Sequence, residues 1–493
     1  MHLTLRSALL AAVALSAPSL CHAADITPEQ ARTLEGQLRG WFAGMAGPGL
    51  PVATSPIQVT PDGDHYRLTA PPAGVKMPVE GWPPVTLNAR PADGGRWTLD
   101  GIKIQSPATF TVETKATKKA GEAAGAPTRT TYTFSYATQE GGGTWDPAFA
   151  TPSVISSNAT GFRMLAETDG AKTVTTMDRT ASVMTLKPVA GDRVDFSLDG
   201  TGTGYAMQVM GGTGDAGGPG LQARARQVKV QVAMPGVSRM RTTQIVPALV
   251  RMGRQADGTP NPGGKPNPEG VRLLIAALQG FASGMTLSEV LDDFSVKTSG
   301  IDVKMGQLRF AMDARADGGL LNGGMDIGMD ALALGGMGLE GFADLLPRRV
   351  AMRPIVSNVP SKELLELLQA MSDDPDGKAP PAQVAAVFGK GGIKTGLESF
   401  AVDMGGATFT GKADVLVPNP NEASGTAQIV ATNLDALMAK VQAIPALAQQ
   451  GVPVIVFAKG IGRVEGGKIV WDVQFDQGKL LVNGVDLMKM AGK

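Results

Sequence analysis

Apolar and polar residues alternate along much of the chain, and this period of two predicts β-strands. The last example is the clearest: within residues 467–484, Ile469, Trp471, Val473 and Phe475 occupy every second position. The tripeptide Asp-Gln-Gly and then Lys-Leu-Leu-Val-Asn-Gly follow, so this segment predicts a closing β-hairpin. We expect the side chain of Trp471 to point at the last sheet, into either a filled core or a groove, and the intervening Asp472, Gln474 and Asp476 to face water.

The same alternation recurs between Gly-rich and Asp-Gly turns, and it predicts antiparallel meanders with one buried face. Strands and helices do not alternate in the first half, so we expect no parallel sheet there. The predicted strands lie near residues 57–59, 66–68, 85–87, 97–99, 132–136, 194–198 and 228–234, and then 301–305 and 308–312.

Apolar residues at helical spacing predict a smaller number of helices. Thr27 caps the first, with Pro28 in its first turn and a stripe of Leu34, Leu38, Trp41 and Phe42. In the second half we expect helices over residues 271–281, 286–294, a segment capped by Ser361, and 433–450 with a bend at Pro445.

Residues 254–269 carry mostly Pro, Gly and Asn, without an apolar period, and we expect a linker or long loop there. The sequence thus divides into an N-terminal β-rich domain (24–253) and a C-terminal α+β domain (270–493). The fold class that follows is β-rich α+β, with long curved antiparallel sheets and helices packed on one side.

The first 23 residues have the pattern of a secretory signal peptide. Arg6 precedes an apolar run over residues 8–15, which is much shorter than the roughly 20 residues of a membrane span. We expect cleavage after Ala23 and a periplasmic or secreted product. The alternative is a lipoprotein anchored through Cys21, although Leu20 is bulkier than lipoprotein processing favours. We expect no later transmembrane segment, since the longest fully apolar run beyond residue 23 is 452–458.

The composition argues against a nucleic-acid partner and against stabilisation by disulfides. The chain holds 45 basic and 45 acidic residues, so no basic surplus points to a nucleic-acid partner. Cleavage after Ala23 would remove the one cysteine, and stability would then come from burial rather than from disulfides. Gly and Pro, at 64 and 34 residues, fit turns between many strands.

No motif assigns a catalytic or cofactor-binding residue. His65 is the one histidine beyond residue 23, and it is either a general base oriented by Asp62 or Asp64 or an ordinary turn residue. The second interpretation is favoured because no nucleophile motif accompanies it. The sequence GTGDAG (212–217) matches a dinucleotide fingerprint, but a loop and a strand follow it instead of a helix.

Metal sites are equally weakly indicated. The segment DDPDGK (373–378) lacks the spacing and closing Glu of a calcium loop. Met325, Met329 and Met337 are close in sequence, yet alternate positions in a strand predict ordinary core rather than copper ligands. We therefore expect no metal and no cofactor, while scattered carboxylates leave a glycosidase-like hydrolase as an alternative.

Three segments of the second half resemble known envelope proteins. They are LLPRRVAMRPIVSNVPSKELLELL (345–368), GTAQIVATNLDALMAKV (425–441) and VQFDQGKLLVNGVDL (473–487). They resemble YdgA-like proteins, a Gram-negative family without established function, and related alphaproteobacterial exported proteins. The pattern is more distantly similar to AsmA-like proteins, which typically carry an N-terminal membrane anchor.

The resemblance implies amphipathic strands with short helices and supplies no catalytic residue. We therefore expect a non-enzymatic cell-envelope protein that binds a lipid, another apolar ligand or an envelope partner in a sheet-lined groove. The alternatives are the carboxylate-dependent hydrolase and a purely structural scaffold without a sizeable pocket.

Overall fold

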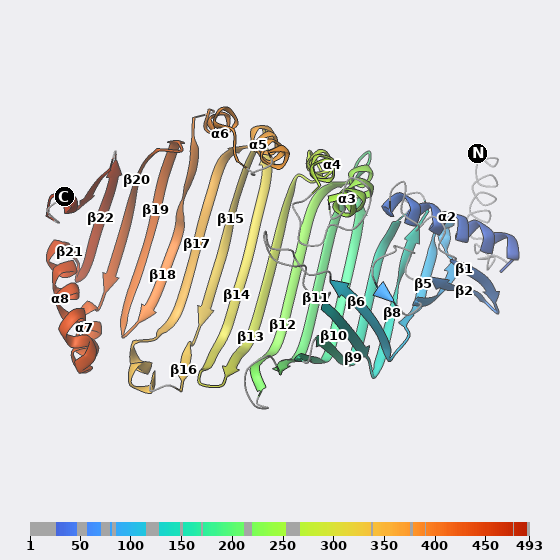
Figure 1. Cartoon of the computed structure of the whole chain (residues 1–493), viewed down its shortest axis with the longest axis horizontal. Helices are drawn as coiled ribbons and strands as arrows, with labels where there is room; N and C mark the ends of the chain where they lie inside the picture. Colours follow the sequence, from blue (N-terminus) through green and yellow to red (C-terminus); the bar gives the residue numbers. More distant parts are fainter. Residues whose placement is uncertain are drawn as a thin grey trace, which may run out of the picture.

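One large antiparallel sheet organises the computed structural model (Figure 1). The residues that the structure describes are 26–46, 57–70, 79–80, 85–114, 128–147, 151–168, 171–211, 219–252, 267–336, 339–374, 378–389, 391–476 and 478–490. Within them the sheet has 24 strands. The predicted β-rich character is confirmed.

The first part of the sheet is built from short strands. Pairing runs from β1 through β2, β4, β5 and β8 to β9, and β3, β6 and β7 form a branch that also reaches β9. Their bounds are β1 Gln58–Asp62, β2 His65–Ala70, β3 Val79–Glu80, β4 Val85–Pro91, β5 Trp97–Ile104, β6 Ala108–Thr114, β7 Thr128–Ser135 and β8 Thr138–Asp146.

Long strands then follow one another as neighbours (Figure 1). They are β9 Thr151–Thr168, β10 Ala171–Pro188, β11 Arg193–Met210, β12 Pro219–Ser238, β13 Gly284–Thr298, β14 Asp302–Asp317 and β15 Leu320–Asp330. The sheet continues through β17 Pro347–Pro360, β18 Ile393–Met404, β19 Ala407–Asn419, β20 Glu422–Thr432, β22 Lys468–Asp476, β23 Lys479–Val482 and β24 Val485–Asp486. Two short strands, β16 Ala333–Gly335 and β21 Arg463–Glu465, pair with β14 and β22.

The sheet is continuous across the predicted domain boundary. β12 pairs with β13 over most of its length, from Leu221 with Thr298 to Ala233 with Thr286. Most of the predicted linker, residues 254–266, lies outside the described residues, and Asn267 caps the next helix by accepting from the backbone N–H of Glu269. The two predicted halves therefore share one sheet.

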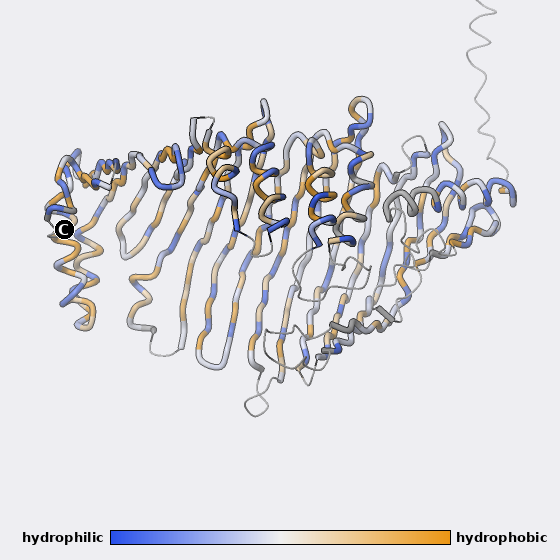
Figure 2. The backbone as a smooth tube through the Cα atoms, turned by 45° about the horizontal axis from the view of Figure 1, so that its top comes forward, coloured by the Kyte–Doolittle hydropathy of each residue, from blue (hydrophilic) through white to orange (hydrophobic). Residues whose placement is uncertain are grey.

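Four helices lie at one end of the long strands. They are α3 Arg239–Met252, α4 Pro268–Leu278, α5 Ser361–Asp373 and α6 Pro381–Phe388, and consecutive ones are in contact. Figures 1 and 2 show them as a row along that end, above strands whose hydropathy alternates residue by residue. In the described part of the chain, none of the helices has both the length and the apolar character needed to cross a bilayer.

The helix α2 (Pro28–Ala46) packs on the first strands. Thr27 caps it as predicted, since the Thr27 Oγ1 accepts from the Gln30 N–H. Leu34 is fully buried against a cluster that includes Tyr66, Trp97 and Trp145. The Tyr66 hydroxyl joins helix to sheet, because it accepts from the Thr27 N–H at 2.7 Å and lies 2.9 Å from Gln30 Oε1.

Two helices pack on the last strands. They are α7 (Leu434–Gln442) and α8 (Pro445–Ile461), so the predicted single helix over 433–450 is two, and Pro445 begins the second instead of bending the first. The side chain of Trp471 is 8% exposed beneath them, and its Nε1 donates to the Ala458 carbonyl at 2.8 Å. At this position the face is a filled core. A short helix, α9 (Leu487–Met490), ends the described chain.

Asn483 ties the closing hairpin to the end of α8. It has a positive φ of 48°, a conformation that Asn tolerates better than most residues. Its Nδ2 donates to the carbonyls of Ile461 and Val470, and its Oδ1 accepts from the Asp472 N–H, each at 2.9 Å. The predicted hairpin is confirmed, and its Asn-Gly pair also anchors the helix.

A row of residues with left-handed backbone conformations, which we call the left-handed row, crosses the long strands. Gly161, Gly204, Asp293 and Ala331, on or beside alternate strands, all have positive φ. Ladder pairs on both sides of each place them in one line across the sheet. At this row the alternation shifts by one residue, so Ala223 and Val228, five positions apart, lie on the same face.

This shift explains a wrong prediction. Residues 286–294 form part of β13, not a helix. Leu287, Leu291 and Phe294 mimic helical spacing because Asp293, with φ of 50°, restores the register of the apolar face on its far side. Ser361 also differs: it begins α5 without capping it, and its hydroxyl donates to the Gly319 carbonyl.

Candidate functional site

The ladder pairs assign the side chains of the long strands to two faces. Directly paired residues lie on the same face of a sheet, and successive residues alternate between faces. One side of the sheet carries mostly apolar residues from Val230 on β12 onward. Glu289, the partner of Val230 on β13, is the charged exception. We call this side the apolar face. Its central row, which we call the apolar row, is Glu289, Phe310, Ile327, Met352, Phe400, Gly411, Ile429 and Trp471.

The opposite side, which we call the polar face, carries the charges of the same strands. At its centre Arg353 forms ion pairs with Asp313, Asp326 and Glu398, which come from three neighbouring strands. The hydrogen bonds that the Arg353 guanidinium donates to Asp313 and Glu398 raise its pKa above the usual value. This arrangement clamps β14, β15, β17 and β18 together on the side away from the apolar row.

The middle of the apolar face lacks the cover that its two ends have. Trp471 is buried beneath α7 and α8, whereas Phe310, Ile327, Met352 and Phe400 are all partly exposed. Exposure is higher still for Val356, at 41%, on the same strand as Met352. A contiguous exposed apolar surface in a soluble protein is typical of a binding site.

A hollow of about 500 Å³ opens on this face between β10 and β13. Small residues create it: Ala223 and Ala225 on β12 leave room between larger neighbours on β11 and β13. Burial in this region raises the pKa of Tyr205. The hollow is lined by Met177, Tyr205, Met207, Leu221, Ala223, Val228, Glu289, Leu291, Phe294 and Val296.

The apolar row leads from the hollow toward the C-terminal helices. It spans eight strands, from Glu289 on β13 to Trp471 on β22, which corresponds to about 34 Å at the usual spacing between strands. Continuing from Glu289 in the other direction, the row passes Val230 and Gly200 and reaches Ser182 and Ser157. The row is therefore apolar from Phe310 to Trp471 except at Gly411, whereas on the other side of Glu289 it is small or hydroxylated beyond Val230.

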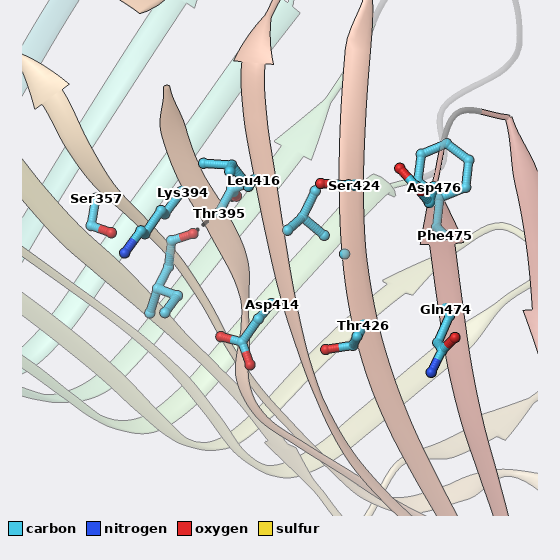
Figure 3. A pocket seen from close by; sticks show the side chains of 13 residues that line it. Ser357, Lys394, Thr395, Asp414, Leu416, Ser424, Thr426, Gln474, Phe475 and Asp476 are labelled. Carbon is cyan, nitrogen blue, oxygen red and sulfur yellow. Dashed lines mark hydrogen bonds between the residues drawn. The ribbon is translucent and has the colours of Figure 1, made fainter. Parts of the chain in front are cut away.

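A second hollow, of about 590 Å³, lies on the polar face near the ends of β17 to β22 (Figure 3). Lys394, Asp414, Thr426 and Gln474 point into it from successive strands. Asp414 and Asp476 are two strands apart and offset by two residues, so their Cα atoms are separated by about 12 Å.

His65 lies at the start of β2, beside the turn that joins β1 to β2. Its Nδ1 is 2.9 Å from Asp64 Oδ1, and its Nε2 is 3.9 Å from Asp62 Oδ2. The hydrogen bond with His65, together with the nearby Arg90, lowers the pKa of Asp64. Both neighbours that the sequence suggested are present, near the N-terminal edge of the sheet and away from the hollow of the apolar face.

The other sequence candidates are not part of this site. Residues 212–217 and Met337 lie outside the described residues, as do Cys21 and residues 375–377 of the acidic segment. Met325 and Met329 lie on the apolar face of β15, paired with Met312 and Leu308. Among the described residues, no three His, Cys, Asp or Glu side chains are grouped as a metal ion would require.

No family model, curated protein or solved structure matches this chain.

Proposed function

We propose that this is a non-enzymatic protein of the cell envelope whose apolar face binds a lipid or another ligand with a long apolar chain. One observation carries the proposal: the apolar row is partly exposed over the strands between the hollow at β13 and the helices at β22. A chain that covered about 300 Å² of this surface would gain about 7 kcal/mol, before the costs of binding are subtracted.

The arrangement of helices supports the same proposal. We take α2, α7 and α8 to pack on the same side of the sheet, because the side chains under α2 and under α7 and α8 belong by pairing to the apolar face. These three helices cover the two ends of the apolar face and leave the middle of the face for a ligand. The export signal expected at residues 1–23 and the resemblance to YdgA-like and AsmA-like proteins agree with a role in the envelope, in the periplasm.

The hollow favours ligand binding over a purely structural scaffold. A scaffold would need no space on its apolar side, whereas this face has a volume of about 500 Å³ lined by apolar side chains and one carboxylate. Pockets of this size and character are typical of sites for small apolar ligands.

The experiment is to purify the protein from a cell-envelope fraction, extract it with organic solvent, and identify the extract by mass spectrometry. We expect a lipid in near-stoichiometric amount. The delipidated protein should also bind a neutral fluorescent probe with a long alkyl chain. Finding neither a co-purifying lipid nor probe binding would contradict the proposal.

A further inference from the structure

One charged residue lies on the apolar face. Among the described residues of β9 to β20 and β22, pairing places only Glu289 there. This leaves aside the bulges and the residues at the left-handed row, among them Asp178, Arg226 and Asp293, which have no ladder partner and to which pairing assigns no face. We propose that Glu289 recognises a positively charged amine at the head of an amphiphilic ligand, whose alkyl chain extends along the row toward Trp471. This inference rests on the proposed function and adds the chemical class of the ligand.

The surroundings of Glu289 make it part of the site. It lines the hollow, and its direct partners on the two adjacent strands are Val230 and Phe310. Leu287 and Leu291, two residues away on its own strand, lie on the same face. The carboxylate is thus enclosed by apolar side chains on all four sides in the plane of the sheet, while it remains exposed to solvent above.

Binding of an apolar ligand would change the environment of this carboxylate. A ligand that covered the row would remove water from Glu289, and an unpaired buried carboxylate costs several kcal/mol. A ligand amine would restore the lost hydrogen bonds as a charge-assisted pair. A neutral head would leave the charge uncompensated, and an anionic head would add repulsion.

Two features set the direction of the ligand. Phe310, next to Glu289, offers an aromatic ring that attracts a cation. From there the row is apolar through Ile327, Met352 and Phe400, whereas on the other side of Glu289 it becomes small and hydroxylated at Gly200 and Ser182. The head therefore fits at Glu289 and the chain fits toward the C-terminal strands.

The test compares three competitors of equal chain length: dodecylamine, dodecanol and dodecanoic acid. Each displaces a neutral fluorescent alkyl probe from the delipidated full chain at pH 7 and low salt. We expect dodecylamine to bind about tenfold more tightly than dodecanol, and dodecanoic acid to bind more weakly than both. In Glu289→Gln the advantage of the amine should disappear, while affinity for dodecanol is retained or improved.

The matched control is Asp199→Asn, which removes one carboxylate from the opposite face. Asp199 pairs with Gln231, which pairs with Ser288 next to Glu289, so both changes affect the same region of the sheet. The control should keep the preference for the amine. Equal affinity of the wild type for amine and alcohol, or a preference that survives Glu289→Gln, would overturn the inference. Failure of every alkyl compound to displace the probe would instead contradict the proposed function.

Discussion

Replacing Trp471 with alanine is expected to lower the free energy of unfolding by about 3–5 kcal/mol, the usual cost of removing a large buried aromatic side chain. Trp471 is 8% exposed, and it packs with Leu437, Val441 and Ile469 beneath the C-terminal helices. The change also removes the hydrogen bond to Ala458, which leaves one carbonyl of α8 without that donor. Equilibrium unfolding in urea, followed by circular dichroism, measures the effect.

The control for this prediction is Phe475→Ala on the same strand. Phe475 lies on the same face as Trp471 but is 39% exposed, so its removal should cost about 1 kcal/mol or less. A similar small cost for Trp471→Ala, together with loss of ligand binding, would mean that Trp471 lines a groove instead of closing a core.

Replacing Met352 with lysine is expected to weaken binding of a long-chain ligand at least tenfold. Met352 is in the middle of the apolar row, between Ile327 and Phe400, and is partly exposed. An alkyl chain lying over this position would cover the lysine ammonium, and burying an unpaired charge costs several kcal/mol. Titration of the delipidated protein with a neutral fluorescent alkyl probe gives the dissociation constant.

Two further variants make this prediction specific. Thr410→Lys adds the same charge at an exposed position of β19 on the polar face, and it should leave the dissociation constant within about twofold. Ile429→Lys adds it on the apolar face at a residue that is 36% exposed, and it serves as a control for the effect of a charge on this face on folding. Equal affinities of Met352→Lys and Thr410→Lys for the probe would show that the ligand does not use the middle of the apolar face.

Much of the fold follows from alternation in the sequence. The closing hairpin, with Trp471 on the inner side and Asp472 on the outer side, could be predicted because apolar and polar residues alternate from Trp471 to Asp476. The long strands were harder to predict, since the left-handed row shifts the alternation halfway along each. The predicted strand 194–198 therefore stops short of Gly204, residues 301–305 and 308–312 of β14 looked like two strands, and residues 286–294 looked like a helix.

The candidate site could be predicted only in its general character. Alternation indicates that each strand has one apolar side, but it does not give the register that aligns these sides across many strands. Glu289 was missed for this reason, although a signal was present: it occupies an apolar position between Leu287 and Leu291. A single charge on the apolar side of a strand has little meaning until the neighbouring strands are known to continue that side.

The proposed function requires that the apolar face, and not another part of the surface, carries the ligand. Residue-resolved photolabelling with an alkylamine that bears a diazirine in its chain tests it most directly. We predict labels on Phe310, Ile327, Met352 and Phe400. Labels confined to the polar face, or to the exposed apolar residues Val454, Val456 and Phe457 of α8, would contradict it.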